Sequence, residues 1–247
     1  MNDRAYEQAK SLSRRIAASV GSPRFYMDKD TEIRLSGDMY QDETLTKACV
    51  KIVEERGDRL GHGREHFQKV AIESGALVMI ESGPDTLPSE MRRLVRMAHL
   101  AGILHDIRRD EDNHARRGAE EAIAVLSSLR LPAGEVLAVS RAIVNHEAFQ
   151  PEQPADDPAA QLISDALYDA DKFRWGPDNF TDTIWAMLAC REIPISKAIP
   201  RFLAGLEGIK RIRTTFRTAT GRRYGPDFID RGLTIGARLY TELTNTA

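Results

Sequence analysis

The sequence predicts an all-α fold, and three observations support that prediction. Leucine, alanine, arginine, glutamate and isoleucine recur three and four residues apart over most of the 247-residue chain, which is the spacing of one face of a helix. The alternation of apolar and polar residues that marks a half-buried strand is scarce. Glycines and prolines fall between the periodic segments, where helices end. With 42% hydrophobic residues, a chain of this length can bury the core of a helical bundle.

Residues 1–45 are predicted to form an N-terminal helical extension on a helical domain that spans residues 46–247. Residues 4–19 have the pattern of an amphipathic helix, which we expect to stop near Gly21. Residues 23–37 are predicted to be a connector, with TEIRL as a short extended piece.

Apolar residues at helical spacing predict further helices along the rest of the chain. Ser89 is the expected N-cap of one of them, directly after a proline. The segment 149–158 contains three prolines and is expected to be irregular, and GRRYGPD at 221–227 is expected to be a turn. The predicted helices span residues 41–55, 62–81, 89–105, 114–129, 133–147, 159–171, 181–191, 195–218 and 227–244.

The composition indicates a soluble cytoplasmic protein. The formal net charge is −2, with 29% charged residues of both signs, so no basic excess indicates nucleic-acid binding. The N-terminus lacks the apolar stretch of a signal peptide, and no apolar run approaches the roughly 18 residues that a membrane helix needs. The two cysteines, Cys49 and Cys190, indicate no disulfide framework. We expect no membrane and no nucleic-acid partner, and a homodimer stays open.

The apolar run AGIL at 101–104 ends in His105 and Asp106, side by side. Taken alone, this doublet is most simply explained as a solvated helix end. Adjacent helix positions point about 100° apart, so both side chains reach one centre only if it lies over the helix end. The positions of the other histidines and aspartates favour a shared centre over the helix end as the explanation of the doublet.

The histidines and aspartates that are candidate metal ligands lie at the ends or on the inner sides of separate apolar helices. Imidazoles and carboxylates mixed in this way suit Mn, Fe, Ni, Co or Zn better than Ca. The pattern leaves open one or two divalent transition-metal ions, with Asp106 as the bridge between them. The candidate ligands are His66, His105, Asp106 and Asp171 for one ion, and His114, His146 and Asp106 for a second.

The order of these motifs resembles the HD superfamily of metal-dependent phosphohydrolases. Its opening H-G-x-x-H-x-x-V pattern is similar to residues 62–70, with one residue of slippage before the valine. The His-Asp doublet follows a small and apolar run at 101–106, and further histidines follow at His114 and His146. The closing D-A-D-[KR] pattern is similar to DADK at 169–172.

This resemblance covers roughly residues 50–220 and implies an HD-domain helical bundle with a metal site between its helices. It implies His66, His105, Asp106 and Asp171 as core metal ligands, with His114 and His146 added in members that have two metals. It also implies a phosphohydrolase that cleaves a phosphate ester, often of a nucleotide or a related small molecule.

Several other polar residues are candidates for contact with substrate. Lys172 follows the last aspartate and is the best candidate to contact phosphate. Arginine suits phosphate oxygens, and Arg109 and Arg174 are the candidates among the arginines that lie near the site along the chain. His62 shares a helix face with His66 and is expected to contact substrate or a ligand, with a plain helix start as the alternative.

The remaining candidates are expected to have structural roles. His99 lies six residues before the doublet, so it points elsewhere and is predicted to be a satisfied core histidine. Asp169 competes with Asp171, but the D-A-D order favours the later residue. Trp175 and Phe180 could stack on a base, although core packing is expected. The basic run 210–223 is expected to be a solvated surface.

The predicted mechanism is hydrolysis by a hydroxide that the metal generates from water. Asp106 and Lys172 are the candidate catalytic residues, the first orienting the nucleophile and the second stabilising charge on the phosphoryl oxygens. Two alternatives stay open. The same ligands could hold a di-iron centre that oxidises its substrate with oxygen, or the site could bind a nucleotide as a sensor without turnover.

Overall fold

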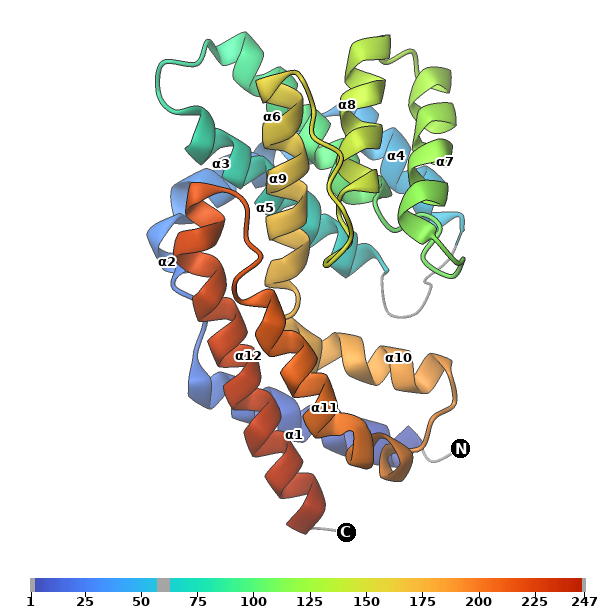
Figure 1. Cartoon of the computed structure of the whole chain (residues 1–247), viewed down its shortest axis with the longest axis vertical. Helices are drawn as coiled ribbons and strands as arrows, with labels where there is room; N and C mark the ends of the chain where they lie inside the picture. Colours follow the sequence, from blue (N-terminus) through green and yellow to red (C-terminus); the bar gives the residue numbers. More distant parts are fainter. Residues whose placement is uncertain (1–2, 57–62, 246–247) are drawn as a thin grey trace.

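The structure is a computed structural model that describes residues 3–56 and 63–245, and within these ranges every regular element is helical (Figure 1). The all-α prediction is confirmed. The elements are α1 (Asp3–Val20), α2 (Phe25–Asp28), α3 (Asp30–Asp42), α4 (Thr44–Glu54), α5 (Arg64–Ser82), α6 (Pro88–Leu104), α7 (His114–Ser128), α8 (Ala133–Val144), α9 (Pro158–Phe173), the π-helix η1 (Asn179–Thr183), α10 (Ile184–Cys190), α11 (Ile195–Ile212) and α12 (Ala219–Asn245).

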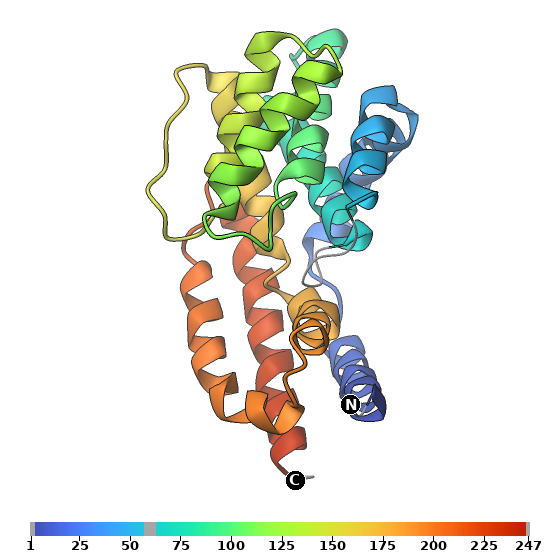
Figure 2. The same cartoon turned by 90° about the vertical axis from the view of Figure 1, so that its right-hand side faces the viewer.

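The upper half of the molecule is a bundle in which α5, α6, α8 and α9 pack around one core, with α7 against α8 (Figures 1 and 2). The helices α5 and α6 lie unusually close, because Gly102 has no side chain to hold them apart. A Cβ built on Gly102 would lie 2.5 Å from the Cα of Ala71. His66 lies on α5 five residues before Ala71, and His105 follows Gly102 by three residues.

The lower half contains α1, η1, α10, α11 and the 27-residue α12. The helix α12 packs on both α1 and α11, and it reaches the upper bundle through α9 and α5. Aromatic rings fasten this junction: Phe173 of α9 and Phe228 of α12 are stacked with centroids 4.2 Å apart, and Phe25 packs against both. None of the helices in the described ranges combines the length and the apolar character needed to cross a bilayer.

The N-terminal segment contacts both halves. The helix α3 packs on α5, and α1 packs on α12 and η1. The Tyr6 hydroxyl donates to the carbonyl of Ile193 at 2.5 Å, and the Ser13 hydroxyl donates to that of Phe180 at 2.5 Å. The boundary between residues 45 and 46 stays a prediction.

Two predictions of irregular structure were wrong. Residues 23–37 are mostly helical, and TEIRL lies inside α3, where acidic residues in the first turn favour a helix start. Residues 221–227 lie inside α12, although they include Pro226. The glycines there allow close packing instead of a turn: a Cβ on Gly221 would lie 1.9 Å from the Asp169 carboxylate, and one on Gly225 would meet the ring of Phe216.

Several predicted helix boundaries also differ from the structure. The predicted helix over 41–55 is interrupted at Glu43, which is extended and whose side chain accepts from the backbone of α4. Ser89 is not the N-cap of α6, because the helix begins at Pro88, whose fixed φ suits the first turn. The loop 149–158 is irregular as predicted up to Asp157, which caps α9.

Candidate metal centre

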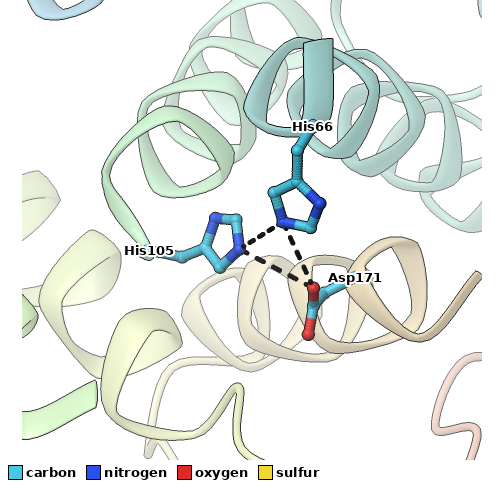
Figure 3. Close-up of side chains that lie close together, drawn as sticks. All are labelled: His66, His105 and Asp171. Carbon is cyan, nitrogen blue, oxygen red and sulfur yellow. Dashed lines mark hydrogen bonds and ion pairs between the residues drawn. The ribbon is translucent and has the colours of Figure 1, made fainter. Parts of the chain in front are cut away.

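Three side chains from three helices point toward one another (Figure 3). His66 comes from the first turn of α5, His105 from the residue after α6, and Asp171 from α9. The Nε2 atoms of the two histidines are 3.2 Å apart, and each lies 3.7 Å from Oδ1 of Asp171. We call these residues the first group.

These separations fit donors that share one metal ion. An ion about 2.0–2.2 Å from nitrogen and oxygen ligands holds neighbouring ligands about 2.8–3.1 Å apart in octahedral coordination and about 3.3–3.6 Å apart in tetrahedral coordination. The separations within the first group are slightly above these two ranges. The residues therefore fit a divalent transition metal in chemistry and in spacing.

A second group consists of Asp106, His114 and His146. Oδ1 of Asp106 is 3.6 Å from Nε2 of His114 and 3.5 Å from Nε2 of His146. The other oxygen, Oδ2, faces the first group, 3.3 Å from Nε2 of His105 and 3.7 Å from Nε2 of His66. Asp106 thus lies between the two groups with one oxygen toward each, as the bridging prediction requires.

Local structure explains how the adjacent His105 and Asp106 reach one centre. The helix α6 ends at Leu104, and the doublet lies in the turn that follows, where His105 keeps helical backbone angles of φ −57° and ψ −36°. The carbonyl of Gly102, which this ending leaves available, accepts a hydrogen bond from Nδ1 of His105 at 2.8 Å. A single helix end therefore supplies both donors and fixes one of them.

Hydrogen bonds on the outer nitrogens aim the imidazoles inward. Nδ1 of His146 donates to the carbonyl of Ile143 at 2.6 Å, as Nδ1 of His105 does to Gly102. Nδ1 of His114 is 3.0 Å from a carboxylate oxygen of Glu147. Such contacts fix the tautomer that leaves Nε2 free for a metal, and they raise its basicity. Sequence reasoning missed Glu147, although it directly follows a predicted ligand.

The electrostatics of the two groups favour a bound cation. Burial opposes the charged form of His105, but the carboxylates of Asp106 and Asp171 outweigh it and raise the pKa of His105 to about 10. Burial likewise works against ionised Asp106, yet His105 beside it holds the pKa of that carboxyl well below its usual range. Burial also opposes the charge of Asp171, but Lys172 and His105 hold its pKa well below the usual range. Both candidate ligands are therefore ionised at neutral pH.

Arg109 and Lys172 lie at the edge of this centre, and their predicted contact with substrate stays a prediction. Nζ of Lys172 is 2.5 Å from Oδ2 of Asp171, and the residue is buried. Nη1 of Arg109 donates to Nε2 of His114 at 2.7 Å and lies 3.8 Å from Oδ1 of Asp106. Arg109 thus contacts the atom of His114 that a second ion would need. His62 lies outside the described residues.

Arg174 is committed to protein partners. Its guanidinium donates to Glu73, Asp178 and the hydroxyl of Tyr26. Both Glu73 and Arg174 are buried, with side chains only 4% and 5% exposed. This network joins α2, α5 and the end of α9, so it holds the frame of the site. The predicted contact of Arg174 with substrate stays a prediction.

His99 is a buried core histidine as predicted, but only one of its nitrogens is paired. Nε2 is 2.9 Å from the hydroxyl of Ser36, which itself donates to the carbonyl of Ile72. Because that hydroxyl proton is already used, Nε2 carries the proton and Nδ1 is left as an acceptor without a partner. Burial lowers the pKa of His99 to about 3.

A cavity of about 670 Å³ opens beside the two groups. His66, Asp106, His114, His146 and Asp171 line one end of it. The helices α10 and α11 line the rest, together with Trp175 and Phe180. Phe180 is core as predicted, whereas Trp175 is 37% exposed and borders the cavity. Sequence reasoning missed this cavity entirely.

Comparisons with known proteins gave one similar solved structure. No family model matches the chain, and no curated protein matches it. The fold is similar to a predicted HD superfamily hydrolase from an uncultured Thermotogales bacterium, with 22% sequence identity and a TM-score of 0.45. The similarity covers 81% of this chain and 90% of that one. That protein carries the name of the superfamily that the sequence motifs resemble.

Proposed function

We propose that this chain hydrolyses a phosphate ester with the help of one or two divalent transition-metal ions. The observation that carries the proposal is the pair of His/Asp groups that meet on Asp106, one carboxylate oxygen facing each.

The reaction consumes one water and one ester. An oxygen–phosphorus bond forms from water, the bond from phosphorus to the ester oxygen breaks, and the alcohol leaves with a proton that the water gives up. A bound divalent metal would lower the pKa of water toward about 7 and polarise the phosphoryl group.

The side chains of the chain itself would bind and orient the ester. Lys172 and Arg109 both border the cavity and carry the positive charge that phosphoryl oxygens require. Lys172 contacts Asp171, so its ammonium is held at the side of the first group. Asp106 would link the two groups, because one of its oxygens faces each. The hydrogen bonds from the Nδ1 atoms of His105 and His146 would hold the Nε2 atoms of these residues in place.

The test is phosphate release from a panel of phosphate esters and nucleotides, with Mn²⁺, Co²⁺ or Ni²⁺ added. Asp106→Asn keeps the size of the side chain but removes the charge shared by both groups, so we expect release to fall at least a hundredfold. Asp165→Asn is the matched control, because Asp165 lies on α9 but bonds to Gln161 away from the centre. Equal release by Asp106→Asn and wild type would refute the proposal.

Two other functions would give different results in the same samples. A di-iron oxygenase would retain iron and consume oxygen without releasing phosphate. A sensor would bind a nucleotide without turnover. A nucleotide as the natural substrate stays a prediction, and the walls of the cavity bear on it.

A further inference from the structure

The wall of the cavity that α10 and α11 form is mostly apolar, whereas polar side chains such as Glu147, Gln150 and Asn179 line other parts of it. Between residues 184 and 212, the only charged or polar side chains that line it are those of Lys197 and Arg201. The other lining residues in that range are apolar or glycine, and they include Ile184, Met187, Ile193, Phe202, Leu206 and Ile209. A volume of about 670 Å³ is that of a pocket for a small organic molecule.

The cavity extends along one face of α11. Its lining residues on this helix begin at Lys197 and end at Ile212, which spans about 20 Å at 1.5 Å per residue. The guanidinium of Arg211 lies over the ring of Phe149, with 4.4 Å between its Cζ atom and the ring centroid. Because Phe149 follows His146 by three residues, the C-terminal end of α11 is the end near the metal centre. Lys197 and Arg201 lie toward the remote end.

Two glycines of α11 enlarge this space. Gly205 and Gly208 line the cavity, and a Cβ built on either would meet nothing within 4 Å. Glycine in a helix interior destabilises the helix relative to alanine. Their positions leave open volume along an apolar wall that already borders the metal centre.

We propose that the substrate is a phosphate monoester whose body is a long hydrocarbon chain, with the phosphate at the metal centre and the chain between α10 and α11. This inference rests on the proposed function and replaces the nucleotide expected from the sequence. A nucleoside would bring hydroxyls and base edges that need hydrogen-bond partners, and the walls of α10 and α11 supply few. A hydrocarbon needs none and displaces water from apolar side chains.

The first experiment measures kcat/KM for n-alkyl phosphates from ethyl to decyl, with nucleoside monophosphates in the same panel. Each methylene that leaves water for an apolar wall contributes about fourfold. We therefore expect kcat/KM to rise steeply from ethyl to decyl and to exceed the values for the nucleotides. Equal values across the series, or a preference for nucleotides, would overturn the inference and leave the proposed function standing.

A matched pair of variants tests whether the hydrocarbon chain of the substrate lies in the cavity. Both glycines are exposed and have open space around them, but Gly208→Leu adds its side chain at a residue that lines the cavity, whereas Gly134→Leu adds the same side chain on α8, outside the lining. We expect Gly208→Leu to lower the ratio of the decyl to the ethyl kcat/KM at least tenfold, and Gly134→Leu to leave the ratio unchanged. The same ratio in both variants would overturn the placement.

A binding measurement separates failure of the inference from failure of the proposed function. Decylphosphonate has no ester bond to cleave, and Trp175 borders the cavity, so its fluorescence should shift on binding. Trp175→Phe removes this signal and leaves only the buried Trp185. A saturable shift without phosphate release from any ester would refute the proposed function while supporting the apolar site. No shift in metal-loaded protein would overturn the inference.

Discussion

Replacing Gly102 with alanine should weaken metal binding through a change in helix spacing. The added Cβ would lie 2.5 Å from Cα and 2.7 Å from N of Ala71, whereas ordinary contacts begin at 3.4 Å. Both of these atoms are backbone, so α5 and α6 must separate by about 1 Å at this point. His66 lies on α5 and His105 directly follows α6. Their Nε2 atoms, now 3.2 Å apart, would move beyond the spacing of neighbouring ligands.

The expected cost of Gly102→Ala is about 10- to 100-fold in metal affinity, the range for disturbing the groups that orient metal ligands. Overpacking should also cost about 1–3 kcal/mol of stability. Calorimetric titration with Mn²⁺ or Co²⁺ measures the affinity, and urea unfolding of the metal-free protein measures the stability.

The control for this prediction is Gly134→Ala, on an exposed turn of α8 with open space around it. This variant should gain about 0.5–1 kcal/mol of stability, because alanine favours a helix over glycine. It should bind metal as the wild type does. Wild-type metal affinity in a folded Gly102→Ala protein would show that the approach of α5 and α6 does not set the ligand spacing.

Three further predictions concern side chains around the centre. His99 is neutral when folded, with a pKa of about 3, but titrates near 6.5 when unfolded. The unfolded chain binds more protons between these values, so stability falls as the pH drops below about 6.5, by up to about 1.4 kcal/mol per unit. His99→Gln should flatten that slope in urea unfolding at pH 7.5 and 5.5, and parallel slopes would contradict this. Arg109→Gln removes the donor on Nε2 of His114, so a second equivalent of Co²⁺ should bind several-fold more tightly, and an unchanged second affinity in calorimetry would contradict this. Arg174→Met removes the ion-pair partner of the buried Glu73 and leaves it the hydrogen bond from the Tyr26 hydroxyl, so the variant should cost about 3–5 kcal/mol in urea unfolding, whereas a loss below 1 kcal/mol would show that Glu73 is neutral.

The candidate ligands could be predicted because they lie next to helix ends that the sequence marks clearly. The apolar run before His105 predicts a buried helix, and the charged residues after Asp106 predict its end. In the structure α6 ends at Leu104, and His105 and Asp106 lie in the turn that follows. Glu147 could have been proposed from its position beside His146, since imidazole ligands commonly bond a carboxylate.

Other features depend on contacts between residues far apart in sequence. Gly221 and Gly225 have the local pattern of a turn, but they lie in a helix because Asp169 and Phe216 approach them closely. The apolar residues of α10 and α11 have the pattern of an ordinary core face. Nothing in that pattern distinguishes a face packed against another helix from a face that borders a cavity.

The candidate metal ligands and the apolar wall of the cavity come from different segments of the sequence. The candidate metal ligands all lie between residues 66 and 171, whereas the apolar wall on α10 and α11 lies between residues 184 and 212. Mutations in the later segment can alter the volume and polarity of the cavity while every metal donor stays in place. Evolution, or an engineer, can therefore change which molecule the protein accepts without changing the chemistry performed on it.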